Sequence, residues 1–258
     1  MKVLKSFFSI INYKTFLMAI LSVVSSYLCI TYEIEAQFPF YLISIAIVFP
    51  IVFSIDSAYK RREQALQFYA DLKAHAISYY LAARDWVGDK DPNISQNVKT
   101  QVIGIFKKIS ENFLKTAEEA KASEKDVYKS FSKLAKDLED YRKIGVSGSE
   151  LSRMHQYVSK MMISYGVVRN IFFYRTPLTL RAYSKIFIYS FPVLYGPYSA
   201  YTYFDFPYHN MAYIIAILYS IILVSLDNLQ EHLENPFDQV GEDDIHFEVE
   251  ELEDVLNH

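Results

Sequence analysis

The first group of residues that suits ion chemistry in this 258-residue chain is an apolar stripe near the N-terminus. Its members lie three or four residues apart and so share one helical face: Leu42, Ile45, Phe49 and Phe53. A ring of such faces from several copies of a chain makes a narrow apolar constriction that gates ions by dewetting. Packing against neighbouring helices is the commoner role of an isolated apolar stripe, and both interpretations stay open.

Polar side chains follow this stripe directly. Ser54 and Asp56 come straight after Phe53, and the last apolar run of the chain ends in the same way, at Asp227 and Asn228. Ionisable residues at the edge of a membrane segment are candidates for a functional site, because burying a charge in lipid is costly. These endings favour a protein that lines a path for ions.

The C-terminal segment is rich in oxygen-bearing side chains. Hard cations such as Ca²⁺ bind six to eight oxygens, so this segment is chemically suited to one. From composition alone, a solvated acidic tail is the simpler interpretation. The residues concerned are Asn235, Asp238, Glu242, Asp243, Asp244 and Glu248.

Other kinds of chemistry have no support in the sequence. There is no His-Glu-x-x-His pattern, the seven glycines form no phosphate-binding loop, and Cys29 is the sole cysteine. We therefore predict that the protein is not an enzyme. A net charge of −4 without a concentrated basic face also argues against a nucleic-acid partner.

The elements that position the stripe are four apolar runs, at about residues 15–33, 38–55, 186–204 and 211–226. Crossing a bilayer takes roughly 20 mostly apolar residues, so each run is a predicted membrane span. Prolines inside two of the runs are tolerated in a membrane bundle, where neighbours satisfy the freed carbonyl. The alternative is a soluble bundle with buried core helices, and the uncharged hairpins oppose it.

The basic residues lie on one side of these spans. The short links at residues 33–37 and 205–210 contain no Lys or Arg. The positive-inside rule therefore places both termini and the middle of the chain in the cytoplasm, with the spans in a plasma or inner membrane. The flanking basic residues are Lys2, Lys5, Lys14, Lys60, Arg61, Arg62, Arg169, Arg175, Arg181 and Lys185.

The middle of the chain, about residues 57–180, has the apolar periodicity of amphipathic helices. Its first helix is expected to continue directly from the second span, because no Gly or Pro lies between Phe53 and Trp86. The predicted fold class is therefore all-α. Residues 1–258 form one polytopic membrane subunit with four transmembrane helices, a long cytoplasmic helical region, and an acidic tail at 231–258.

These pieces, in this order, resemble the bestrophin family of membrane channels, including its bacterial members. The stretch from Pro39 to Tyr59 looks like the pore helix of the family, and Arg84-Asp85-Trp86 occupies a related helix end. Residues 174–183 resemble the segment before the third span. The most specific likeness is the segment from Leu226-Asp227-Asn228 through Asn235-Pro236-Phe237 to the acidic residues at Asp244.

The resemblance implies a homopentamer that conducts anions such as chloride passively along a central axis, with membrane lipid and inorganic ions as its partners. It assigns the apolar neck to Ile45, Phe49 and Phe53, part of the stripe found above, and the cytoplasmic aperture to Leu178. In animal members the acidic turn holds Ca²⁺, and the matching residues here are Asn235, Asp243 and Asp244.

This chain departs from the family pattern at two places that matter for function. Ser54 and Asp56 replace the Arg and Asn usual at the pore exit, which removes a cation and adds an anion beside the path. Asp238-Gln239-Val240 precedes Gly241, where the family has Gly directly after Pro-Phe, and this alters the Ca²⁺-binding turn. The alternatives are thus a cation-permeable homologue, or a non-conducting scaffold that recruits a cytoplasmic partner.

Overall fold

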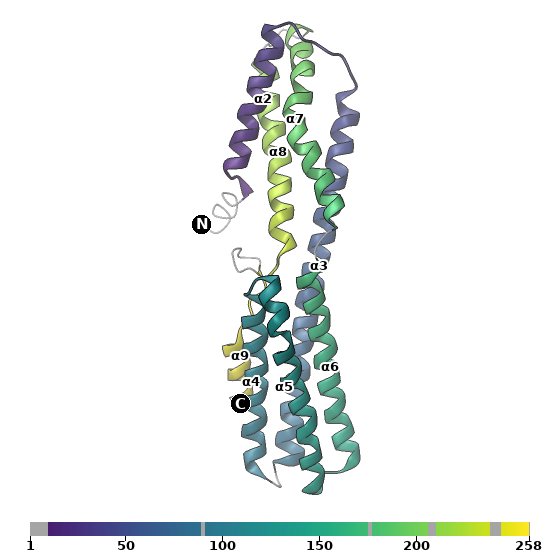
Figure 1. The fold of residues 1–258 in the computed structure, drawn as a ribbon, viewed down its shortest axis with the longest axis vertical. Helices are drawn as coiled ribbons and strands as arrows, with labels where there is room; N and C mark the ends of the chain where they lie inside the picture. The colour runs from purple at the N-terminus through teal and green to yellow at the C-terminus, as the bar shows by residue number, and fades with distance from the viewer. Residues whose placement is uncertain (1–9, 89–90, 175–176, 206–209, 238–243, 258) are drawn as a thin grey trace. The chain divides into compact units, whose positions relative to one another are not determined.

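The computed structural model describes residues 10–88, 91–174, 177–205, 210–237 and 244–257, and within them it contains helices and no strands (Figure 1). The all-α prediction is confirmed. The elements are α2 (Tyr13–Thr31), α3 (Phe40–Ala82), the π-helical turn η1 (Ala83–Val87), α4 (Pro92–Phe113), α5 (Ala117–Lys143), α6 (Gly148–Phe173), α7 (Leu178–Asp205), α8 (Asn210–Glu234) and α9 (Val249–Asn257).

The chain divides into two compact units. The first comprises residues 1–60 and 176–235, and so contains α2, the beginning of α3, α7 and α8. The second comprises residues 61–175 and 236–258, with the rest of α3, η1, α4, α5, α6 and α9. As expected from the absence of Gly and Pro after Phe53, α3 continues without interruption from the apolar run into the amphipathic region.

The first unit has an inverted distribution of side chains, which α2 illustrates. Small and polar residues of α2 point inward, among them the buried Thr15, Ser22 and Ser26. Large apolar residues such as Phe16 and Ile20 are exposed. This distribution is unfavourable in water and favourable in lipid, where burial of apolar surface between helices gains little and close packing decides association. The outer surface of the first unit therefore suits a hydrocarbon environment.

The inward face of α2 lets helices approach closely. A Cβ at Gly196 of α7 would lie 2.4 Å from Ser25 Oγ and 2.9 Å from Cys29 Sγ, so a larger residue there would force these neighbours to shift. On α8, Ser220 Oγ donates a hydrogen bond to Ser22 Oγ at 2.9 Å. Small residues and hydroxyl bonds at such contacts are the usual means of joining helices in membranes. They join α2, α7 and α8 side by side, as Figure 1 shows.

The second unit has the opposite pattern, with large apolar side chains inside and charges outside. Capping boxes at Thr116 and Ser147 set the starts of α5 and α6. Burial raises the pKa of the Tyr165 hydroxyl to about 12. A bidentate ion pair joins Arg169 to Glu124, with N–O distances of 2.6 and 2.9 Å. This is the ordinary packing of a helical bundle in water.

The C-terminal segment belongs to the second unit through its apolar residues. Phe237 is almost fully buried, and its ring stacks on Phe113 at 5.1 Å and on Phe247 at 5.8 Å between centroids. Further along, Leu252 and Leu256 of α9 are buried as well. The acidic side chains between them, such as Glu248 and Glu251, remain exposed. Apolar side chains spaced between the acidic ones bury this segment in the core.

Among the residues that the structure describes, three helices are long and apolar enough to cross a membrane: α2, the helix from Phe40 to Val87, and α8. They cover most of the first and second predicted spans and all of the fourth. Helix α7 contains the third, residues 186–204, but is not among the three, since its tyrosines and the prolines at 192 and 197 lower its hydropathy. The total of four membrane spans therefore stays a prediction.

Substitution Gly196→Ala is expected to lower the melting temperature of the protein in detergent. The new methyl group would meet the Ser25 backbone oxygen at 3.2 Å as well as its hydroxyl, and overpacking of this kind costs about 1–3 kcal/mol. Circular dichroism during heating measures the effect. Gly104→Ala and Gly166→Ala are the controls, since a Cβ there meets nothing within 4 Å. A melting temperature equal to that of these controls would contradict the close approach.

Substitution Phe237→Ala is expected to release the C-terminal segment, because it removes one of the three rings in the cluster of Phe113, Phe237 and Phe247. Truncating a buried Phe costs about 3–5 kcal/mol. Hydrogen–deuterium exchange should show loss of protection across residues 244–257. Val255→Ala is the control, because Val255 is exposed on the same segment. Equal protection in the two variants would show that the stack does not anchor the segment.

Candidate functional site

Helix α3 presents two different faces within the first unit. Ile45, Phe49 and Phe53 are 48%, 55% and 63% exposed, and the Phe49 and Phe53 rings lie 6.0 Å apart. Residues on the opposite face of the helix point the other way, because an α-helix turns once every 3.6 residues. Those inward residues are buried: Ile47, Ile51, Ser54 and Ala58.

The buried face explains why the stripe points outward. Ile47 and Ile51 are 1% and 0% exposed and belong to a core shared with α7 and α8. Rotation of α3 would expose these side chains, so the packing of one face fixes the direction of the other. The α7 and α8 residues of this core include Ile188, Phe191, Tyr195, Ala216, Leu223 and Val224. The stripe predicted from the sequence is thus a free surface of the single chain.

Pro50 lies between two residues of the stripe. Proline has no N–H, so the helix loses one backbone hydrogen bond at this point. Nevertheless α3 runs through Pro50 without a break, from Phe40 to Ala82. Phe49 and Phe53 therefore remain on one continuous helix.

The two residues predicted at the pore exit lie on different faces. Asp56 is exposed on the same side of α3 as Phe49 and Phe53, three residues beyond Phe53. Its carboxylate accepts a hydrogen bond from the Lys60 ammonium at 2.7 Å, as an i,i+4 ion pair. Ser54 is fully buried, on the inward face. A charged pair, rather than a serine and an aspartate, therefore follows the stripe.

Leu178, the residue predicted at the aperture, is the first residue of α7 and is 77% exposed. One turn further on, Arg181 forms an ion pair with Glu234 near the end of α8. The start of α7 is thus held to α8 while Leu178 remains free to contact another molecule or solvent.

Sequence reasoning did not identify a network of charges that joins three helix ends in the first unit. Glu231 of α8 accepts hydrogen bonds from Lys14 of α2 at 3.2 Å and from Lys185 of α7 at 2.5 Å. Asn228 accepts one from Asn12 at 3.0 Å. Removing one partner would leave the other charge partly buried and unpaired. The spacing of Asp227, Glu231 and Glu234 on one face of α8 was the available signal.

The structure does not test whether the predicted residues bind Ca²⁺. Asp243 lies outside the described residues. Asn235 and Asp244 are both half-buried and each has an interaction partner. Within the part of the chain that the structure describes, no group of three or more His, Cys, Asp or Glu side chains has the geometry of a metal site. Calcium binding by this segment therefore stays a prediction.

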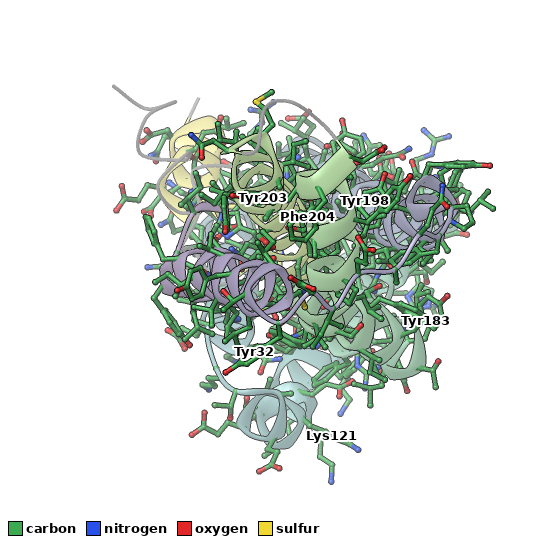
Figure 2. The ribbon with its side chains drawn as sticks, turned by 90° about the horizontal axis from the view of Figure 1, so that it is seen from above. Tyr32, Lys121, Tyr183, Tyr198, Tyr203 and Phe204 are labelled. Atoms are coloured by element: carbon green, nitrogen blue, oxygen red, sulfur yellow. The ribbon has the colours of Figure 1, made fainter. Side chains whose placement is uncertain are left out.

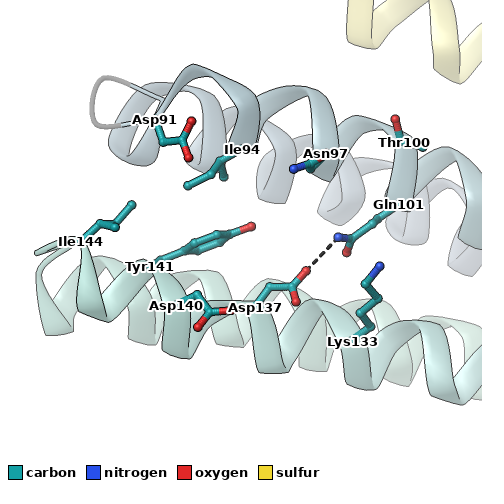
Figure 3. A pocket seen from close by; sticks show the side chains of 10 residues that line it. All are labelled: Asp91, Ile94, Asn97, Thr100, Gln101, Lys133, Asp137, Asp140, Tyr141 and Ile144. Carbon is teal, nitrogen blue, oxygen red and sulfur yellow. Dashed lines mark hydrogen bonds between the residues drawn. The ribbon is translucent and has the colours of Figure 1, made fainter.

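The second unit has a polar cavity of about 520 Å³ between α4 and α5 (Figure 3). Its central contact is a hydrogen bond of 2.8 Å from Gln101 Nε2 to Asp137, and Lys133 lies nearby on α5. The Tyr141 ring points into the gap between the helices, and burial raises the pKa of its hydroxyl to about 12. A phenol with so high a pKa stays protonated at neutral pH and offers no phenolate to act as a base, so these residues do not form an evident catalytic group.

Comparison with known proteins gives no sequence relative: no protein-family model matches the chain, and neither does any curated protein. Solved structures do match. A variant of a bacterial bestrophin homolog from Klebsiella pneumoniae has a TM-score of 0.80 and 17% identity, covering 94% of this chain and 97% of that one. The chain has a bestrophin-like fold. A second variant of this homolog has a TM-score of 0.78 and 18% identity over 98% of both chains.

A crystal structure described as a membrane protein agrees, with a TM-score of 0.80, 16% identity, and coverage of 95% of this chain and 98% of that one. At this level of identity the similarity concerns the fold. Together with the apolar helices and the inverted packing of the first unit, the bestrophin-like fold indicates an integral membrane protein.

Proposed function

We propose that the chain is one subunit of a homopentameric ion channel that conducts passively through a neck of apolar side chains. The observation that carries the proposal is the free apolar face of α3, which is backed by a buried face and lies within a bestrophin-like fold. A long row of exposed Ile and Phe on one helix needs a partner, and copies of the same face around an axis supply one.

The proposed neck consists of Ile45, Phe49 and Phe53 from each subunit. Apolar rings offer an ion no replacement for its water shell, so passage requires partial dehydration, and a narrow ring of this kind can close by dewetting. Leu178 would form a second apolar constriction on the cytoplasmic side. Neither constriction requires bond chemistry, which is consistent with a protein that is not an enzyme.

The proposed topology has four spans per subunit, with α7 as the third. Both termini, the helical region at about residues 57–180 and the segment at 231–258 would lie in the cytoplasm, with membrane lipid around the first unit. The basic residues on one side of the spans support this orientation.

Ion selectivity would depend on the charges that follow the neck. Anions are the expectation from the resemblance of the sequence to the bestrophin family, whereas a ring of Asp56 carboxylates raises the local concentration of cations. Lys60 partly neutralises that ring, because the two side chains form an ion pair. We propose that the balance between Asp56 and Lys60 sets the preference.

Substitution of Phe49 or Phe53 by Ala is expected to raise single-channel conductance several-fold, since a wider neck lets ions keep more of their water. Recordings from the purified protein in planar bilayers measure this. Leu21→Ala is the matched control, because it removes an exposed apolar side chain from α2 instead of α3. Conductance unchanged in both Phe variants would place the ion path elsewhere.

Opposite shifts in reversal potential are expected from the two charges of the pair in an asymmetric KCl gradient. Asp56→Asn removes a negative charge from each subunit and should move the reversal potential toward the chloride equilibrium value. Lys60→Gln should move it toward the potassium value. Two unchanged reversal potentials in conducting variants would exclude this pair from the path.

A further inference from the structure

The first unit contains a second feature that the proposed ion path does not use, a partly open apolar cavity of about 530 Å³. It lies between the start of α3, the last turns of α7 and the start of α8. Cavities that hold small ligands typically range from about 300 to 1,000 Å³ and are lined mainly by apolar and aromatic groups. The lining includes Phe40, Tyr195, Tyr198, Ala212, Ile215 and Tyr219.

Contacts among aromatic rings hold the walls of this cavity in place. The Phe40 ring stacks on Tyr198 at 4.8 Å and meets Tyr195 and Tyr219 edge-on at 5.2 and 5.5 Å. The Tyr195 hydroxyl donates a hydrogen bond to the backbone oxygen of Ala212, at 3.4 Å. Ala212 is buried and contributes only a methyl group. The cavity is therefore a built feature with a rigid aromatic side and a small-residue side.

The open side of the cavity meets the surface that faces lipid in our assignment. Tyr41, Met211 and Ile215 line it and are themselves exposed, at 65%, 50% and 37%. Ile214 and Leu218 on the adjoining face of α8 are exposed too. None of the described residues that line the cavity is charged. An apolar group can thus enter from the bilayer without crossing a polar barrier.

The chemistry of the lining selects the occupant. Apolar cavities stay dry and accept apolar guests, since water inside them finds too few hydrogen-bond partners. An ionic guest would lose its hydration without gaining a counter-ion. The end of α7 beyond the cavity carries two further aromatic residues, Tyr203 and Phe204 (Figure 2). Aromatic residues are enriched at the level of the lipid headgroups in membrane proteins.

We propose that this cavity binds an acyl chain of a membrane lipid. The chain lies against Phe40, Tyr195 and Tyr219, with its headgroup at the interface near the end of α7. The inference rests on the membrane location of the first unit, and it holds whether or not the protein conducts ions.

Photo-crosslinking tests the proposal on the full chain in vesicles of phosphatidylglycerol that carry a diazirine on one acyl chain. After irradiation and digestion, adducts are expected on cavity residues such as Tyr198 and Ile215. Ala212→Phe fills the cavity and should reduce these adducts at least tenfold, while adducts on the exposed Leu21 of α2 stay constant. Ile214→Phe is the matched control, because it adds the same ring on the exposed face of α8.

A second variant distinguishes a filled cavity from a misfolded protein. Ile215→Phe narrows the mouth from a partly exposed position and should reduce the adducts in a protein that keeps its melting temperature. Adducts confined to exposed residues such as Leu21 and Leu218, or cavity adducts unchanged in both filling variants, would overturn the proposal. Absence of cavity adducts together with an altered oligomeric state in these variants would assign the cavity to a contact between subunits, which also overturns it. Failure of conduction with intact adducts would instead refute only the channel.

Discussion

The close approach of α2 to α7 depends on residues too small to keep the helices apart. Gly196 faces Ser25 and Cys29, and the serines at 22 and 220 share a hydrogen bond. In water, large apolar side chains would take these inward positions, because burying them is the main favourable term in folding. In lipid that term disappears between helices, so short side chains and hydroxyl bonds determine the contact. The inverted arrangement of α2, and the membrane assignment built on it, both follow from this constraint.

The close packing of these helices also orients the face of α3 on which the function is proposed. With α7 and α8 held against α2, they form a core that takes the inward face of α3. The outward face then presents Ile45, Phe49 and Phe53 as one apolar row followed by a charged pair. A network centred on Glu231 joins the ends of the same helices by charge, where the spans meet water. Close packing and ion pairs thus hold the same helices together at different places along their length.

The second unit has the opposite distribution of side chains, which suits water. Its helices bury Phe and Leu and expose Lys and Glu, and an aromatic stack seals the C-terminal segment into the core. In the sequence, the acidic residues are the conspicuous feature of that segment. Its position is determined instead by four buried apolar residues, Phe237, Phe247, Leu252 and Leu256. Acidic side chains can stay solvated in many conformations, whereas a buried phenylalanine has very few.

The sequence alone determined the helices, the apolar runs, the continuity of α3 and the stripe on its face, because these depend on local spacing and on the absence of Gly and Pro. It also indicated the bestrophin-like fold. Only the tertiary structure decided that the face of α3 with Ser54 is buried, that Glu231 joins α2 to α7, and that an aromatic cavity opens beside Ala212. Most of these features depend on which helices meet. Contacts between residues far apart in sequence determine which helices pack together, and the pattern of a single segment does not show these contacts.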